Sequence, residues 1–269
     1  MRGYVLGHSE AELRRLKAQA REIDPVTRRF LAEAGVGAGM RVLDVGTGAG
    51  DTALLLADVV GTSGEVVGFD RSAEALEVAR AKVSARSLRN VTFVESAGDG
   101  LTFDAPFDAV FGRYVLQFQS EPARLLAAVA AHAKPGALIV FHELDWSGSS
   151  SVPPAPTYDR LTQWAMATIE RSGANVHMGL QLPAAFAAAG LPEPVLRLDG
   201  LIAAGEHVRS LLELKGNLGA TLAPAMAEYG IATPEELGID TLLERMIDEA
   251  IANRSVIVSR FEVGAWARV

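Results

Sequence analysis

Three glycines at alternate positions are the most informative chemical feature of this sequence. They lie in the run Asp44-Val-Gly46-Thr-Gly48-Ala-Gly50, between a short apolar segment and a helical one, and Asp70 ends the next apolar segment. Glycines in a strand-to-helix turn let backbone N–H groups approach a ligand closely, and an acid at the end of the next strand can bind ribose hydroxyls. The spacing therefore predicts a site for a cofactor that contains a nucleoside.

The residue after the third glycine bears on which cofactor binds. The last glycine of a dinucleotide fingerprint that starts at Gly46 would fall at Asp51. An aspartate at the start of a helix would repel a pyrophosphate. The sequence therefore favours a ligand with a positive or zwitterionic group at this point, and it leaves a nicotinamide-dependent oxidoreductase as a minor alternative.

Alternating apolar and helical segments must position these residues. Short apolar runs at 41–46, 65–70, 91–95, 107–111 and 137–141 alternate with helical patterns over 52–60, 72–83 and 122–133. This alternation predicts a parallel sheet with right-handed crossovers. Because ligands gather at the carboxyl ends of parallel strands, the residues that follow these strands become the candidates for a site.

Helical patterns flank the predicted strands on both sides. An amphipathic helix with the capping-box pair Ser9 and Glu12 comes first, and we expect it to pack over the ligand edge of the sheet. The Ser- and Pro-rich segment 147–156 predicts a linker or lid hinge. Beyond it the sequence predicts helices over 161–171, 182–190, 206–229 and 234–252, a strand over 195–202, and a hairpin-like strand region over 255–268.

Composition limits the classes of function. The 269 residues carry a net charge of −8, which disfavours nucleic acid as a partner, and the absence of cysteine excludes thiol nucleophiles and thiolate metal sites. The few histidines are scattered, so no metal is predicted. The first residues lack the apolar segment of a secretory signal, and no stretch is apolar enough for a membrane span. We therefore expect a cytoplasmic protein without a membrane partner.

The chain resembles the class I S-adenosylmethionine-dependent methyltransferases, in particular a bacterial branch that acts on small molecules. The resemblance extends over nearly the whole chain, and its residues are the Asp44–Gly50 motif, Asp70, Phe107-Asp108-Ala-Val and the turn Lys134-Pro-Gly136. It implies an α/β fold with a Rossmann-like, seven-stranded, mostly parallel sheet, an antiparallel last strand, helices on both faces and a helical cap. The expected divisions are an N-terminal helical segment covering the cofactor (1–34), a cofactor-binding core (35–146), and a lid with the last strands (147–269).

The resemblance implies S-adenosyl-L-methionine as the cofactor. The backbone of the glycine turn would cradle its methionine part, Asp70 would bind both ribose hydroxyls, and the loop after the third strand would hold the adenine. The family commonly has Gly-Asp in that loop where this chain has Ser96-Ala97, so either Asp99 or the backbone of Ala97 and Gly98 contacts the adenine. The predicted cofactor-binding residues are Asp44, Gly46, Thr47, Gly48, Gly50, Asp70, Arg71, Ala97, Gly98, Asp99, Arg113 and Tyr4.

Two of these residues, Asp44 and Arg113, have more than one interpretation, and Tyr4 has one. Asp44 either contacts the cofactor or is a buried turn acid or helix cap. Arg113, at the end of the fourth strand, either faces the amino acid end of the cofactor through its backbone or forms a surface ion pair. Tyr4 lies in the segment that closes over the cofactor in similar proteins.

Candidates for an acceptor site follow the fourth and fifth strands. His142 and His177 are the candidate general bases, needed for an alcohol or carbon acid but not for an acceptor that is already ionised. An ordinary structural role is the alternative for each histidine and for Trp146. The predicted substrate-binding residues are Tyr114, Gln117, Phe118, Trp146 and Gln181.

The sequence as a whole predicts an S-adenosylmethionine-dependent methyltransferase that acts on a small molecule in a partly covered apolar pocket. The methyl group would pass by in-line displacement, with O-, N- or C-methylation left open. A protein that binds the same cofactor without methyl transfer, as a sensor or as a catalyst using the sulfonium charge, is the main alternative. Fold-level analogy adds the expectation of a homodimer through the C-terminal helices.

Overall fold

The computed structural model describes residues 10–98 and 100–269, with side chains from residue 22 onward. Its contacts divide the chain into two compact units. Within the described residues, the sheet unit comprises Ile23–Glu143, Met178–Leu198 and Val263–Val269, and the helical unit comprises residues 10–22, Leu144–His177 and Asp199–Glu262. Each unit is described by itself below.

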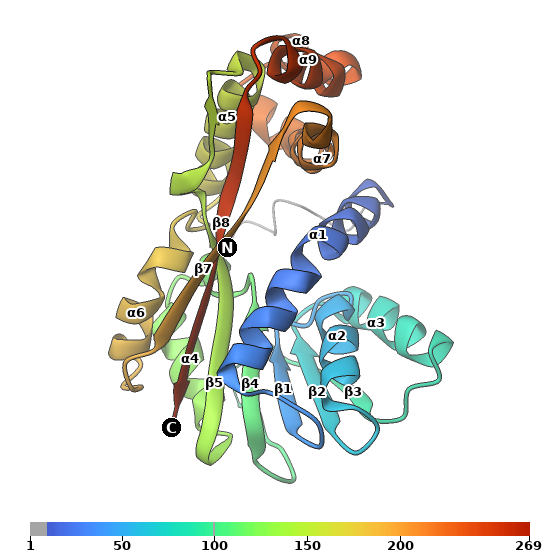
Figure 1. The fold of residues 1–269 in the computed structure, drawn as a ribbon. Coiled ribbons are helices and arrows are strands. Elements are labelled where there is room, and N and C mark those ends of the chain that lie inside the picture. Colours follow the sequence, from blue (N-terminus) through green and yellow to red (C-terminus); the bar gives the residue numbers. More distant parts are fainter. Residues whose placement is uncertain (1–9, 99) are drawn as a thin grey trace. The chain divides into compact units, whose positions relative to one another are not determined.

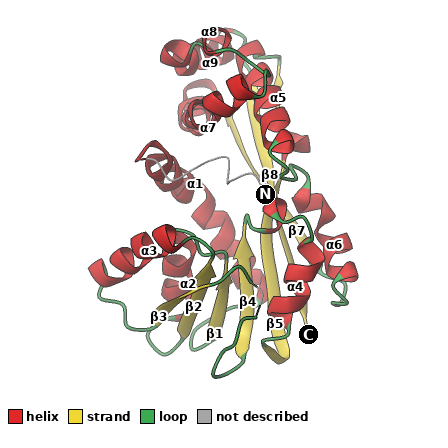
Figure 2. Cartoon of the chain, turned by 180° about the vertical axis from the view of Figure 1, so that it is seen from behind, coloured by secondary structure: helices red, strands yellow, loops and turns green. Residues whose placement is uncertain are grey.

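The sheet unit is built around parallel strands. Its elements are the end of α1 (Glu10–Ala34), β1 (Arg41–Val45), α2 (Asp51–Val60), β2 (Glu65–Asp70), α3 (Ala73–Ala85), β3 (Val91–Glu95), β4 (Phe107–Arg113), η1 (Leu116–Phe118), α4 (Pro122–Ala130), most of β5 (Ala133–Asp145) and α6 (Met178–Ala188). β1 pairs in parallel with β2 and β4, β2 with β3, and β4 with β5. Figure 1 and Figure 2 show α2 and α4 on opposite faces of this sheet.

The complete strand order is β3-β2-β1-β4-β5-β8-β6, and β7 (Val195–Ala204) pairs with β8 (Val256–Arg268) beside this path. The N–H of Val269, just after β8, donates to the carbonyl of Ala137 near the start of β5, so β8 runs antiparallel to β5. The predicted α/β class is confirmed, with seven strands on the path, an antiparallel last strand and one strand more than expected.

The helical unit contains three helices that pack against one another, α5 (Pro156–Arg171), α7 (Val208–Glu228) and α9 (Ile239–Ala252). The prediction of one helix over 234–252 is wrong. A capping box at Thr233 starts the short α8 (Pro234–Leu237), and Gly238 ends it in the left-handed conformation at φ 54° before α9 begins. Left-handed backbone is compatible with glycine and stops a right-handed helix, so the segment forms two helices.

Two further expectations about the helical unit and the last strand need correction. The segment 147–156 is more than a linker, because it contains most of η2 (Trp146–Gly148) and the strand β6 (Ser150–Val152), which pairs antiparallel with Val256–Val258. The expected hairpin over 255–268 is a single strand, β8. The polar residues 259 and 260 continue this strand and do not form a turn. Successive side chains of a strand point to opposite faces, and the two faces can have different surroundings.

Apolar runs explain the core of the sheet unit. β1 is buried from Val42 to Val45 and β4 contributes Phe111, as expected for strands covered on both faces. Leu56 of α2 and Val140 of β5 belong to the same buried cluster. This packing fixes the position of the strands, and therefore also the position of the residues that follow them.

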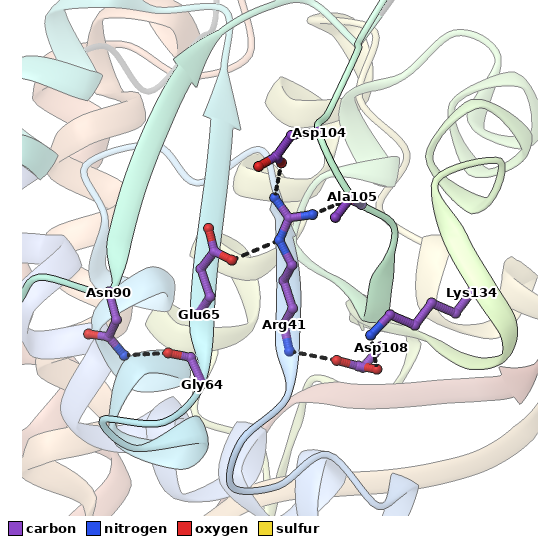
Figure 3. Close-up of polar contacts among 8 residues, drawn as sticks. All are labelled: Arg41, Gly64, Glu65, Asn90, Asp104, Ala105, Asp108 and Lys134. Carbon is purple, nitrogen blue, oxygen red and sulfur yellow. Dashed lines mark hydrogen bonds and ion pairs between the residues drawn. The ribbon is translucent and has the colours of Figure 1, made fainter.

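The amino ends of the strands are joined by an ion-pair network that we call the Arg41 network (Figure 3). Arg41 pairs with Glu65 Oε2 at 2.8 Å and with Asp104 Oδ1 at 2.6 Å. The Arg41 N–H donates to Asp108 Oδ2 at 2.8 Å, and Lys134 Nζ donates to Asp108 Oδ1 at 2.6 Å. Asp108 and Lys134, which contributed to the family resemblance, therefore connect β1, β4 and β5 in this structure.

Candidate cofactor site and acceptor residues

The glycine turn between β1 and α2 has one face open to a ligand. Gly46, Gly48 and Gly50 have φ values of 63°, 51° and 81°, which favour glycine. A Cβ at Gly46 would lie 2.8 Å from Val115 Cγ2, and one at Gly50 would lie 2.8 Å from Ala79 Cβ. At Gly48, no atom of the described residues lies within 4 Å of that position. Packing thus requires glycine at the first and third positions, and a ligand can approach the backbone at the second.

Asp70 is held next to this open face by backbone N–H groups. The Gly48 N–H donates to Asp70 Oδ2 and the Ser72 N–H donates to Asp70 Oδ1, each at 2.9 Å. Ser72 is itself fixed as the N-cap of α3 by the Ala75 N–H at 3.2 Å. Carboxylate oxygens can accept more than one hydrogen bond, so this oriented acid can still accept bonds from a pair of ribose hydroxyls.

Asp44 lies beneath the turn and is fully buried. Its Oδ2 accepts a hydrogen bond of 2.5 Å from Thr47 Oγ1, and within the described residues its Oδ1 is buried without a hydrogen-bond partner. Burial raises the pKa of Asp44 to about 7, although the Thr47 hydrogen bond and the Arg113 charge lower it and the Asp70 charge raises it further. A cofactor with a positive charge close by would favour the ionised form of this acid.

The charge of Asp51, used above against a pyrophosphate ligand, is partly balanced. Lys82 Nζ lies 2.7 Å from Asp51 Oδ1, and both side chains are about one quarter exposed. An aspartate in an ion pair repels an anion less than an isolated one does. Asp51 therefore disfavours a dinucleotide less strongly than the sequence alone indicated. The cofactor assignment depends on the open face at Gly48 together with Asp70.

Arg113, at the end of β4, makes a largely buried ion pair. Its Nη1 lies 2.8 Å from Asp24 Oδ1 on α1, and it also donates to Thr27 Oγ1 at 3.0 Å. An ion pair was one of the two alternatives for Arg113, and it is present. It is not fully at the surface, because the Arg113 side chain is only 10% exposed and that of Asp24 31%. Asp24 and Thr27 were not predicted as site residues, because a contact across nearly ninety positions of sequence leaves no local signal.

His142 lies in the last part of β5 and is fully buried. Its Nδ1 lies 3.1 Å from Thr27 Oγ1, and its ring makes edge contacts with Phe30 and Tyr114 at centroid distances of 4.9 and 5.3 Å. Tyr114 has φ 58°, rare for a residue with a side chain, and its N–H donates to the His142 carbonyl at 2.9 Å. Such backbone strain is common at functional sites.

Glu143 orders the loop that carries the other predicted acceptor residues of the sheet unit. The fully buried Glu143 accepts hydrogen bonds at Oε1 from the N–H groups of Val115 and Leu116, at 2.8 and 2.7 Å. These bonds fix the start of η1, in which Gln117 is buried and Phe118 is partly buried. Glu143 was not among the predicted site residues, although an acid in the last part of a buried strand is a signal for such a role.

The other candidate base belongs to the helical unit. His177 Nδ1 lies 3.5 Å from Oδ2 of the fully buried Asp145, and the His177 side chain is 42% exposed. Trp146 is buried in this unit as well. The structure thus places His142, Tyr114, Gln117 and Phe118 in one unit and His177 and Trp146 in the other. Gln181 is exposed on α6 of the sheet unit.

The predicted adenine loop is described in part. Ser96 donates its N–H to the Asp70 carbonyl at 2.9 Å, and its Oγ accepts from the Gly98 N–H at 3.0 Å. Ala97 is exposed, as is Arg71 after β2. Asp99 and Tyr4 lie outside the described residues, so both readings of the adenine contact stay predictions.

Residues 10–98 and 100–269 contain no group of three or more His, Cys, Asp or Glu side chains placed to hold a metal ion. Within the same residues, no helix has the length and apolar character needed to cross a membrane.

The fold and the glycine turn define an α/β protein with a site for a nucleoside-containing cofactor. A family profile described as "Methyltransferase domain" matches residues 37–216, which is more than half of the chain. The chain therefore belongs to this family, the class I S-adenosylmethionine-dependent methyltransferases. The predicted family and fold are confirmed, and S-adenosylmethionine is the cofactor of this family, as the sequence analysis expected.

Known proteins resemble this chain in part. It is 32% identical over 121 residues to a demethylmenaquinone methyltransferase of Lactococcus lactis. The aligned part covers 45% of this chain and 46% of that protein. It is 41% identical over 103 residues to a 2-phytyl-1,4-naphtoquinone methyltransferase of Synechococcus elongatus, covering 37% and 43%. The chain thus spans about half the length of the curated relatives it matches. A solved S-adenosylmethionine-dependent methyltransferase of Aquifex aeolicus shares the fold with a TM-score of 0.51 and 24% identity, over 75% of this chain and 94% of that one.

Proposed function

We propose that this protein transfers the methyl group of S-adenosylmethionine to a small molecule. The observation that carries this proposal is the open backbone face at Gly48 directly beside Asp70, whose carboxylate is oriented by two N–H groups. Family membership supports it independently.

The residues of the glycine turn fit this cofactor. Asp70 would accept hydrogen bonds from the ribose hydroxyls, the backbone around Gly48 would hold the methionine part, and the buried Asp44 would provide negative charge below it. When bound, S-adenosylmethionine supplies a methyl group on a positively charged sulfur, open to in-line attack by an acceptor atom. The chain's own residues then have to align the acceptor and exclude water.

His142 is the residue we propose as general base in the sheet unit. The hydroxyl of Thr27 lies 3.2 Å from the Ile23 carbonyl and can donate its one proton there, while it accepts a hydrogen bond from Arg113. In that arrangement neutral His142 donates from Nδ1 to Thr27 Oγ1, so Nε2 is its unprotonated ring nitrogen. Arg113 and Thr27 thus favour the tautomer of His142 that a base requires.

The names of the relatives suggest the first acceptor to test. Two of them are named as methyltransferases of naphthoquinone compounds. The reduced form of such a compound is an electron-rich aromatic diol, and we propose this class as the acceptor. His142 would remove a proton from it if it is not already ionised.

Incubation with S-adenosylmethionine carrying a labelled methyl group tests the proposal. The panel contains 1,4-naphthohydroquinone, catechol, an aromatic amine and an alcohol, and mass spectrometry follows both labelled product and S-adenosylhomocysteine. We expect label in an aromatic diol, and no label in the same assay with Asp70→Asn. Labelled product from none of the acceptors would contradict the proposal.

Thermal unfolding in the presence of a ligand shows whether the cofactor binds, independently of whether the correct acceptor has been tested. A ligand at about 100 times its dissociation constant adds roughly 2.7 kcal/mol, which raises the midpoint of a chain of this size by several degrees. We expect this shift with S-adenosylhomocysteine and not with NAD. A shift without any methyl transfer would instead support the alternative of cofactor binding without transfer, and a shift with NAD alone would contradict the cofactor assignment.

A further inference from the structure

The strand β7 carries much of the exposed apolar surface of this protein. Among the described residues, nine large apolar side chains are exposed, and four of them belong to the ten residues of β7. The four are between 48% and 68% exposed, and they are Val195, Leu196, Leu198 and Ile202. Three of the four have even numbers, so they point to the same face of the strand. This face therefore carries an apolar stripe that the described part of the chain leaves uncovered.

One edge of β7 has no neighbouring strand. Among the described residues, β8 is the only strand that pairs with β7 (Figure 1). Alternate residues of a strand direct their backbone N–H and C=O groups to its two sides, so the outer edge of β7 presents such groups away from β8. Edge strands are commonly protected by being short or by containing proline or lysine. With ten residues and neither of these residue types, β7 has the properties of an edge that pairs with another strand.

The charges of β7 are self-complementary, which points to a second copy of this chain as the partner. Arg197 and Asp199 lie on either side of Leu198 and point to the same face of the strand. Antiparallel pairing of two copies centred on Leu198 places Arg197 of each copy directly opposite the partner's Asp199. Opposite charges at such positions stabilise paired strands, and like charges destabilise them. Pairing centred on Arg197 or on Asp199 would oppose two like charges, so the charge pattern favours the register centred on Leu198.

The contacts of Arg197 and Asp199 within the chain are compatible with this pairing. Arg197 Nε lies 3.7 Å from Glu33 Oε2 of α1, and the Arg197 side chain is 52% exposed. An ion pair at this distance and exposure contributes little to stability, so Arg197 can exchange it for another carboxylate at small cost. Asp199 Oδ1 accepts a hydrogen bond of 2.8 Å from the Gly200 N–H, and a carboxylate can accept further bonds from a guanidinium.

We propose that β7 binds a second copy of this chain by antiparallel strand pairing centred on Leu198. The same register brings the Leu198 side chains of the two copies together on one face, and it places Val195 opposite the partner's Leu201 on the other. Backbone hydrogen bonds, two charge pairs and apolar contacts thus all form in one register. Because each copy uses the same surface, the contact closes as a dimer and covers the outer edge of β7. Dimer formation is independent of the proposed methyl transfer.

Sedimentation velocity of the full-length protein over about 1–100 µM tests the dimer, because a short strand pair lies at the small end of protein interfaces. We expect a reversible dimer that Arg197→Asp and Asp199→Arg each weaken by about tenfold, since each variant opposes like charges at two symmetric positions. The double variant Arg197→Asp/Asp199→Arg restores opposite charges and should dimerise within about threefold of the wild type. A monomer at all concentrations, or a double variant no tighter than the single variants, would overturn the proposal.

Single cysteines test the register, because the natural chain contains none. Directly opposed residues of antiparallel strands have Cα atoms about 4.5–5.5 Å apart, which is compatible with a disulfide. Leu198→Cys should therefore form a cross-linked dimer under mild oxidation. Leu196→Cys is the matched control, because the two copies of this exposed position would lie four residues apart, at about 14 Å, and should not cross-link. No cross-link in Leu198→Cys, or equal cross-linking in both variants, would contradict the proposed register.

A matched pair of lysine variants compares β7 with the C-terminal helices, where fold-level analogy placed a homodimer. Leu198 and Ile251 of α9 are similarly exposed, so Leu198→Lys and Ile251→Lys make comparable changes at two surfaces. We expect Leu198→Lys to weaken the dimer by more than tenfold, because it brings two ammonium groups together, and Ile251→Lys to dimerise like the wild type. Circular dichroism verifies that both variants are folded. A dimer that persists unchanged in Leu198→Lys would overturn the proposal.

Discussion

The two ends of the strands in the sheet unit use the same kinds of residue for different purposes. At the amino ends, the carboxylates of Asp104 and Asp108 pair with Arg41 and Lys134 in the Arg41 network (Figure 3). At the carboxyl ends, Asp70 is held by backbone N–H groups and Asp44 is buried below a turn with an open face. The acids at the amino ends pair with basic side chains of the protein, whereas Asp70 and the open face at Gly48 are the groups that we propose contact a ligand.

The direction of the pKa shifts at Asp44 and Asp108 follows the same division. Burial raises the pKa of Asp44 to about 7. Burial also opposes ionisation of Asp108, but the Arg41 N–H and Lys134 outweigh it and hold its pKa below the usual value. Asp108, which contributes to the Arg41 network, is kept ionised. Asp44, at the carboxyl ends of the strands, has a raised pKa and a buried Oδ1 without a hydrogen-bond partner among the described residues. The following predictions test this difference.

The largest expected effect is the pH dependence of stability due to Asp44. Its pKa in the folded state lies above the unfolded value, so the folded protein binds more protons between about pH 4 and pH 7 and loses stability as the pH rises through that window. We expect a loss of roughly 1 kcal/mol per pH unit from this group. Urea unfolding of Asp44→Asn should lack this slope relative to the wild type, and an identical slope in both would contradict the burial argument.

Two glycines with positive φ allow a matched comparison of the two ends. At both Gly48 (φ 51°) and Gly136 (φ 83°), the part of the chain that the structure describes places no atom within 4 Å of an added Cβ. Alanine at either position should lower the free energy of unfolding by roughly 1–2 kcal/mol, because of its left-handed backbone. Only Gly48→Ala should also weaken S-adenosylhomocysteine binding, by about tenfold or more. Equal affinity in the two variants would show that the open face at Gly48 is not the binding surface.

Asp108→Asn should destabilise the fold moderately. It weakens two hydrogen bonds, to the Arg41 N–H and to Lys134 Nζ, and we expect a loss of about 1 kcal/mol at neutral pH. Because its pKa is lowered in the folded state, this contribution is present above about pH 4 and disappears as the pH falls through the folded-state pKa. Urea unfolding of the wild type and Asp108→Asn at neutral and acidic pH measures the loss of stability and its pH dependence. A larger loss of stability at low pH than at neutral pH would contradict this prediction.

The smallest effect is expected at the outer acid of the network. The Asp104 side chain is 87% exposed and its partner Arg41 keeps Glu65 as a second partner. Exposed ion pairs contribute little, so Asp104→Asn should change the thermal midpoint by less than about 1 °C. A clearly lower thermal midpoint in Asp104→Asn would mean that the Arg41 network depends on its exposed acid.

Much of the sheet unit could be predicted because local patterns determine it. Apolar runs of strand length, the glycine turn and Asp70 all lie within short stretches of sequence, and their order predicts the parallel sheet. Thr27 and Asp24 could not be selected, because their contacts with His142 and Arg113 depend on how α1 packs. Asp108 and Lys134 contributed to the resemblance, but only the structure places them at the amino ends of the strands.

The helical unit was predicted less completely, for a physical reason. Its helices were expected from periodicity, but the break at Gly238 depends on one left-handed residue, and glycine also occurs inside α7 at Gly216 and Gly219 without ending it. The burial of Lys215 in α7 could not be predicted either, because a lysine in an amphipathic pattern normally points to solvent. Side chains brought together from several elements have no signature in one stretch of sequence.

A matched pair of aspartate variants tests the central claim most directly, namely that the carboxyl ends of the strands bind the cofactor and the amino ends do not. Calorimetric titration of S-adenosylhomocysteine into wild type, Asp70→Asn and Asp108→Asn compares the same chemical change at both ends. We expect Asp70→Asn to weaken binding by about 100-fold and Asp108→Asn to leave it within about twofold. Equal affinity of Asp70→Asn and the wild type, or an equal loss in both variants, would contradict the claim.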